Sequence, residues 1–422
     1  MITLLIIFLM FYKIELKFGK NKFFDDTLQI TYTNKLRGIS IILILLTHLS
    51  NRLNKNEKNI FFFYFDKGAL YVGLFYFYSG YGLMKSIIHK PNYLNYFFKN
   101  RMTSIYIPFL CFNCLQNTIY IIFGNDVFPV SQKNQPLNPN NISFFNIIRC
   151  YLGFFLINES LWYIQSIIIY YLIFYFCFRL SGINYLLGLL YILIVYLFIT
   201  MLNIQRRDLW GLGYFFSGRQ WYKSMYSFPF GILIGIYDIK LIDWLKKQYN
   251  FYIILIFSIL TQKYTSDKFN YFCSKNAEHK NGFIGILYFI IVIFLGNISI
   301  ISFIISLHCV VMKVKIFNNK IMDFFGNISY EIYMTHTFFI FFYVSLKIQL
   351  KSKRNLQFIL VILSTIITSC IFNFLFNKIT KYVKNNLCCC EQNVQNIIDN
   401  TISDNVSNIH NKDNQKIQVE IS

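Results

Sequence analysis

An arginine and a histidine, Arg37 and His48, stand eleven residues apart in the segment KLRGISIILILLTHLS. Eleven residues make about three turns of an α-helix, so both side chains lie on one face, about 16 Å apart along the axis. A guanidinium suits phosphate binding, and a neutral imidazole in an apolar environment suits proton abstraction from a hydroxyl. The pair therefore indicates a phosphate contact and a base on one helix. The alternative is an arginine that anchors the helix end and a histidine that only packs.

Three more ionisable residues, Arg101, Glu331 and His336, lie in or beside apolar segments. Charged groups inside a membrane are costly, so each is a candidate functional residue. Ser329, Tyr333 and His336 follow the spacing i, i+4, i+7 and share a helix face, whereas Glu331 is expected off that face. His336 would orient an acceptor or pair with a carboxylate, or it is a hydrogen-bonded structural histidine. Arg101 is either a ligand contact or a positive anchor.

The elements that position these residues are apolar helices. The chain is 55% hydrophobic and only 14% charged, with a mean hydropathy of +0.45, which leaves too little polar surface for a protein surrounded by water. Runs such as Leu161 to Phe178 can cross a hydrocarbon core of about 30 Å. We therefore predict an all-α integral membrane protein with about ten transmembrane helices. The predicted spans are 36–50, 68–88, 103–123, 160–178, 183–201, 221–239, 249–262, 283–312, 325–346 and 356–377.

The chain divides into three parts by composition. Residues 1–33 form an N-terminal apolar and basic segment, residues 34–384 form the transmembrane domain, and the polar, Asn-rich residues 385–422 form a disordered cytoplasmic tail. The stretch 142–157 is expected to be an interfacial or re-entrant helix. The run Cys388 to Cys390 after the last span is a palmitoylation candidate or a consequence of composition.

The formal net charge of +21 does not indicate a nucleic-acid partner. The Lys and Arg residues lie in short connectors between apolar runs, where they anchor helix ends and set topology. We expect a multi-pass protein of the cell membrane whose partners are the lipid bilayer and small substrates. Cys111 and Cys114 form a CxxC on one turn of a predicted span without a second pair, so no metal site is expected.

Four further fragments accompany the pair Arg37 and His48. They are FYFYSGYGLMKS with Ser79 in the second span, FFKNRMTSIYIPFL before and in the third, SLWY (160–163) at the start of a middle span, and FFGNISYEIYMTH in the ninth. In this order the five fragments resemble the acyltransferase 3 family of polytopic membrane acyltransferases. The resemblance runs from about residue 34 to residue 377.

One position departs from that family's pattern. The family often carries two arginines three residues apart before the third span, and this chain has Arg101 and Ser104 there. If the arginine pair holds the phosphates of the acyl donor, the affinity for the donor or its identity differs here. Lys99 is the cation that the sequence offers as compensation.

The resemblance implies acyl transfer from acetyl-CoA or another acyl-CoA to a hydroxyl of a cell-surface or lipid-linked carbohydrate, without a bound cofactor. His48 is expected to act as a general base or to carry the acyl group transiently, while Arg37 and Arg101 hold the phosphates of the acyl-CoA. The candidates for acceptor binding or support are Ser79, Tyr330, Tyr333 and His336.

Two alternatives remain at this point. A transporter or channel also uses intramembrane charges, but the chain has neither two similar halves nor a series of acidic residues for ion coupling. A membrane N-acetyltransferase of another family, acting on amino sugars, also has an Arg–His first span. The SGYG and SYxxYxxH patterns favour the acyltransferase 3 family.

Overall fold

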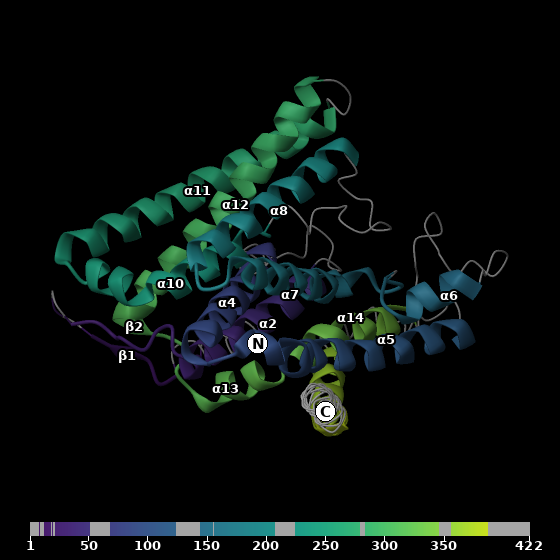
Figure 1. Cartoon of the computed structure of the whole chain (residues 1–422). Helices are drawn as coiled ribbons and strands as arrows, with labels where there is room; N and C mark the ends of the chain where they lie inside the picture. Colours follow the sequence, from purple (N-terminus) through teal and green to yellow (C-terminus); the bar gives the residue numbers. More distant parts are fainter. Residues whose placement is uncertain are drawn as a thin grey trace, which may run out of the picture.

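The computed structural model is a bundle of helices that cross at various angles (Figure 1). It describes residues 8, 12–17, 19, 22–50, 68–123, 144–154, 156–206, 224–278, 283–345 and 356–386. The long helices are α2 (Ile30–Ser50), α4 (Gly68–His89), α5 (Thr103–Phe123), α7 (Trp162–Ser181), α8 (Tyr185–Arg206), α10 (Ser227–Leu245), α11 (Gln248–Glu278), α12 (Phe283–Lys313), α14 (Ser329–Ser345) and a C-terminal helix (Leu356–Asn386). The short ones are η2 (Tyr93–Tyr96), η3 (Phe98–Met102), α6 (Phe144–Tyr151), η6 (Glu159–Leu161) and α13 (Lys320–Asn327).

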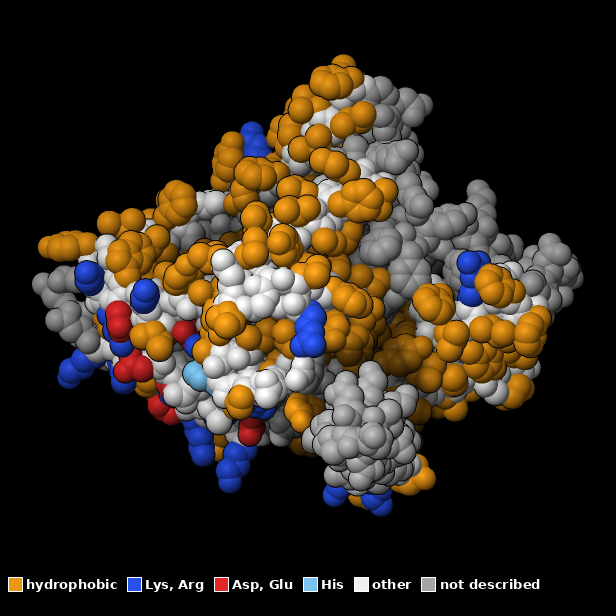
Figure 2. Space-filling view, in the orientation of Figure 1, with side chains coloured by type: hydrophobic (Ala, Val, Ile, Leu, Met, Phe, Trp, Pro, Cys, Tyr) orange, Lys and Arg blue, Asp and Glu red, His pale blue; other side chains and the backbone are white. Residues whose placement is uncertain are grey.

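Two short strands fasten the N-terminal segment to the end of α12. Strand β1 (Glu15–Leu16) pairs antiparallel with β2 (Val314–Lys315), which directly follows α12. The Lys313 ammonium lies 3.6 Å from the centre of the Phe23 ring and donates two hydrogen bonds of 2.8 Å to backbone carbonyls of the N-terminal segment. Basic side chains gather at this end of the molecule, at the lower left of Figure 2.

Helices α2 and α4, which carry the candidates Arg37, His48 and Ser79, pack closely against neighbouring helices through glycine residues. A Cβ atom on Gly38 of α2 would lie 2.1 Å from a backbone oxygen of α13, and one on Gly80 of α4 would lie 2.1 Å from a backbone oxygen of α10. Only glycine allows helices to approach this closely. Because Gly38 follows Arg37 and Gly80 follows Ser79, these contacts fix the positions of both candidates.

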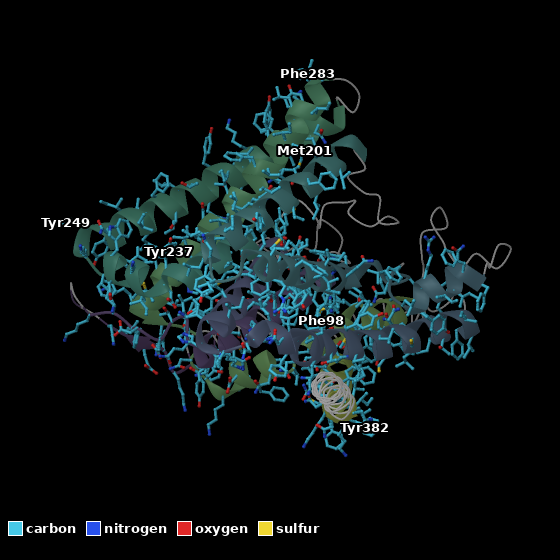
Figure 3. The ribbon with its side chains drawn as sticks, in the orientation of Figure 1. Phe98, Met201, Tyr237, Tyr249, Phe283 and Tyr382 are labelled. Atoms are coloured by element: carbon cyan, nitrogen blue, oxygen red, sulfur yellow. The ribbon has the colours of Figure 1, made fainter. Side chains whose placement is uncertain are left out.

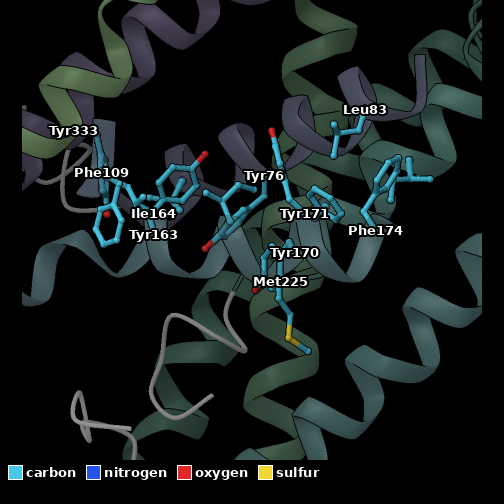
Figure 4. Close-up of a cluster of buried hydrophobic side chains, with 14 of the residues drawn as sticks. Tyr76, Leu83, Phe109, Tyr163, Ile164, Tyr170, Tyr171, Phe174, Met225 and Tyr333 are labelled. Carbon is cyan, nitrogen blue, oxygen red and sulfur yellow. The ribbon is translucent and has the colours of Figure 1, made fainter. Parts of the chain in front are cut away.

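Tyrosine rings in tilted and edge contacts fill the middle of the core (Figure 4). The ring of Tyr76 on α4 lies 5.1 Å from that of Tyr163 and 5.0 Å from that of Tyr170, both on α7. Tyr170 continues to Tyr196 on α8 at 5.1 Å, and Tyr163 continues to Tyr333 on α14 at 5.1 Å. Large rings bury much apolar area with few rotatable bonds, so they hold the four helices in fixed relative positions.

The outer surface is largely apolar. Phe283 of α12, Met201 of α8 and Tyr249 of α11 project outward (Figure 3), and hydrophobic side chains cover the upper face in Figure 2. Among the described residues, five helices are long and apolar enough to cross a membrane. They are Phe98–Phe123, Trp162–Ser181, Tyr185–Leu202, Phe283–Lys313 and Leu356–Asn386. The chain is therefore an all-α membrane protein.

The remaining predicted spans coincide with helices α2, α4, α10, α11 and α14, so the total of ten stays a prediction. The α14 helix has only 17 residues, and α2 and α10 carry charged side chains that lower their mean hydropathy. A short or partly polar helix is harder to assign to the membrane by composition alone.

Two predicted spans differ from the helices that the structure shows. The span 325–346 is interrupted, because α13 ends at Asn327 and α14 begins at Ser329. The helix predicted over 249–262 continues to Glu278 and packs along α12, beside which it lies in Figure 1. Within 142–157 the structure has one short helix, α6. Most of residues 1–12, and of the predicted tail 385–422 with its cysteine run, lies outside the described residues.

Candidate active site

A cavity of about 710 Å³ lies between α2, α4, α7, α14, the C-terminal helix and the start of α5. Seven residues were selected from the sequence, and five of them line this cavity: Arg37, Ser79, Arg101, Tyr330 and Tyr333. They come from four helical segments that are far apart in the sequence. The volume is within the range of sites for small molecules and cofactors.

The cavity wall is strongly basic. Its cationic side chains are Arg37, Lys85, Lys90 and Arg101. Lys85 is neutralised by Asp238 of α10, with 2.9 Å between the ammonium and the carboxylate. Among the described residues that line the cavity, Glu331 is the one carboxylate. A wall with this excess of positive charge favours an anionic ligand.

Arg37 is half-buried at the cavity among tyrosine side chains. Its charge interacts with Tyr78, Tyr163 and Tyr171, and also with the guanidinium of Arg101. The Arg37 Nε atom is buried and has no hydrogen-bond partner. A buried donor left unpaired costs about 1–3 kcal/mol, and an anion bound in the cavity would remove that penalty.

Arg101 lies on η3, a π-helical turn that precedes α5. Its Nε donates a hydrogen bond of 3.0 Å to the hydroxyl of Tyr93, which is buried. This bond uses one of the five N–H groups of the guanidinium, so the others can bind a ligand.

The polar residues of the wall are largely engaged by neighbouring groups. The hydroxyl of Ser79 lies close to that of Tyr163 and interacts with it. Tyr333 donates to the backbone carbonyl of Ser160 at 2.6 Å, and Tyr330 donates to that of Ile105 at 2.7 Å. Both phenols thus use their proton to join α14 to neighbouring segments, which fits a supporting role.

His48 and His336 form a pair beyond the cavity wall. Their ring centres lie 5.0 Å apart, and His336 is fully buried. The His336 ring also lies 5.6 Å from the ring of Tyr333, which lines the cavity. The tertiary fold therefore connects the histidine pair to the cavity through one tyrosine. The sequence analysis named a carboxylate as one possible partner of His336, and in the structure the ring beside it is that of His48.

The hydrogen bonding of His336 defines its tautomer. Its Nδ1 lies 3.0 Å from the carbonyl oxygen of Ile332, which can only accept, so Nδ1 carries the proton. Nε2 then has a free lone pair, and it is buried without a hydrogen-bond partner. A buried acceptor beside His48 can hold an N–H group of the neighbouring imidazole or of a ligand.

Glu331 is a candidate residue to which the sequence assigned no role. It was expected off the face of Ser329 and Tyr333, yet it is buried and lines the same cavity. Asn373 of the C-terminal helix donates to Glu331 Oε1 at 3.2 Å, and Oε2 is buried without a partner. In the sequence, Glu331 was marked only by being an acidic residue within an apolar segment. Ser329, Glu331 and Tyr333 all line the cavity, so the cavity contacts more than one face of α14.

Metal ligation was not expected from the sequence. Over the described ranges, no three or more His, Cys, Asp and Glu side chains are grouped so that they could hold a metal ion.

A family model described as an acyltransferase domain matches residues 30–374. No curated protein matches the chain, and no solved structure matches it. The matched range contains all the residues selected from the sequence and Glu331.

Proposed function

Since the chain belongs to this acyltransferase family and is a membrane protein, we propose that it transfers an acyl group, in the simplest case acetyl, from an acyl-CoA to a hydroxyl group. The acceptor is a cell-surface or lipid-linked carbohydrate, and the site of action is the cell membrane. The observation that carries the donor assignment is the meeting of Arg37 and Arg101 in one cavity that contains a single carboxylate among its described lining residues.

The shape of an acyl-CoA fits the arrangement of the candidate residues. Its phosphates and its thioester are separated by the long pantetheine arm. Arg37 and His48 are separated by three turns of α2, about 16 Å along the axis. Phosphates bound by Arg37 and Arg101 would let the thioester reach toward Tyr333 and the histidine pair.

In the reaction, His48 removes the proton of the acceptor hydroxyl while its oxygen attacks the thioester carbonyl. The C–O bond forms, the C–S bond breaks, and the sulfur of CoA leaves as a thiolate that takes up the proton. In the second route, His48 itself takes the acyl group and passes it to the acceptor. His336 supports either route by presenting its free Nε2 to the His48 ring.

The test uses membranes that contain the protein and acetyl-CoA labelled in the acetyl group. We expect label to appear in surface glycans or glycolipids, in an alkali-labile ester linkage, and to disappear when the gene is deleted. Transfer to an amino group would give an alkali-stable product and would refute hydroxyl acylation. Uptake of a solute without consumption of acetyl-CoA would support a transporter instead.

A further inference from the structure

The C-terminal helix brings an additional cation, Lys384, to the edge of the cavity. Its ammonium donates a hydrogen bond of 2.6 Å to the hydroxyl of Ser104. Ser104 lines the cavity beside Arg101, and its hydroxyl donates to the carbonyl of Asn100 at 2.7 Å. The Ser104 oxygen is thus held as an acceptor for Lys384. The two residues are 280 positions apart in the sequence, so only the tertiary fold makes this contact.

The position of Lys384 on its helix agrees with a role at the cavity. Asn373 and Asn377 of the same helix line the cavity. Lys384 follows Asn377 by seven residues, which is about two turns, so it lies on the same side of the helix. Lys381, by contrast, is exposed.

Lys384 belongs to a group of three neighbouring cations. Its charge interacts with that of Arg101, and Arg101 in turn interacts with Arg37. The ion pairs formed between described residues do not include any of the three. Like charges close together repel each other, so the group is most stable with an anion bound among its members.

Arg101 and Ser104 also stand at the two positions, three residues apart, at which the family that this chain resembles often carries two arginines. The sequence offered Lys99 as compensation for the missing arginine, but Lys99 is not among the described residues that line the cavity. Lys384 places its ammonium directly on the side chain of Ser104.

We propose that Lys384 is a phosphate-binding residue of the acyl-donor site and supplies, from the C-terminal helix, the positive charge that position 104 lacks. The hydroxyl of Ser104 orients the ammonium, whose other two protons and charge are directed to a phosphate oxygen of the donor. The inference rests on the proposed function, because it takes the donor to be an acyl-CoA.

The test measures the binding of radiolabelled CoA to the full chain in lipid nanodiscs. We expect Lys384→Gln to weaken the binding of CoA about tenfold, since a charge-assisted hydrogen bond to phosphate is lost. Lys384→Arg should bind within about threefold of the wild type, because the charge is kept. The matched control is Lys381→Gln, which removes an exposed lysine of the same helix and should leave binding unchanged.

A rescue variant separates loss of charge from loss of structure. Ser104→Arg combined with Lys384→Gln moves the positive charge from position 384 to position 104 and should restore most of the affinity for CoA. Equal binding by Lys384→Gln and the wild type would overturn the inference. So would a loss that neither Lys384→Arg nor Ser104→Arg restores and that accompanies a lower unfolding temperature. If the wild type itself bound no CoA, the donor assignment would fail first and this inference with it.

Discussion

Replacement of His48 by alanine is the sharpest test of the candidate site. His48 is half-buried on α2, and its ring lies 5.0 Å from that of His336. If His48 is the base or the acyl carrier, its loss should lower the rate of transfer about 10²- to 10⁴-fold. At 1.36 kcal/mol per factor of ten, this corresponds to about 3–5 kcal/mol of transition-state stabilisation.

The alternative role gives a much smaller effect of another kind. A hydrogen bond between side chains of neighbouring helices in a membrane contributes about 0.6 kcal/mol on average and at most about 1.7 kcal/mol. A packing histidine would therefore lower the amount of inserted protein without changing the activity of each inserted molecule. The two roles differ by orders of magnitude in turnover.

The assay follows from this difference. Initial rates of transfer from labelled acetyl-CoA are divided by the amount of folded protein in the membrane fraction. We expect His48→Ala to be present at a normal level and to be almost inactive. The control is His308→Ala on α12, a half-buried histidine whose ring lies against Phe77 and Tyr78 and which is not among the described residues that line the cavity. This control should retain its turnover. Near-normal turnover by His48→Ala would refute the assignment of His48 as base or carrier.

Three further outcomes are expected. Arg37→Lys keeps the charge but loses the planar fork, so the KM for the acyl-CoA should rise about tenfold; an unchanged KM would make Arg37 a topology anchor. Gly80→Ala forces α4 away from α10 and should lower the free energy of unfolding by about 1–3 kcal/mol, measured by thermal unfolding of the detergent-purified protein. The control is Gly82→Ala, whose added Cβ meets nothing within 4 Å and which should leave the stability unchanged. Cysteine labelling should find the segment 130–139 extracytoplasmic and the tail after residue 384 cytoplasmic, and labelling of both from one side would contradict the predicted topology.

The residues proposed for donor binding and for acyl transfer lie in two neighbouring regions of the molecule. Arg37 and Arg101 lie at the cavity that suits the phosphates, and the pair of His48 and His336 lies beyond its wall, behind Tyr333. The Tyr333 hydroxyl is fixed by the carbonyl of Ser160.

The sequence by itself determined the class of the protein and the first helix of its site. Apolar runs of span length identify helices because each residue's environment in a bilayer depends on its own side chain and its near neighbours. The spacing of Arg37 and His48 is likewise local, since the period of the helix fixes which side chains share a face. The resemblance to the acyltransferase family, carried by short motifs, is confirmed by the match over residues 30–374.

Only the tertiary structure decided which groups from different helices meet. It turned Glu331 into the cavity, paired His48 with His336, and joined Lys384 to Ser104 across 280 residues. None of these contacts follows from periodicity, because helix–helix packing in a membrane depends on small residues such as Gly38 and Gly80 that set the distance and angle of approach. A periodic pattern tells which face of a helix is distinct, but the partner of that face is chosen by packing of the whole chain.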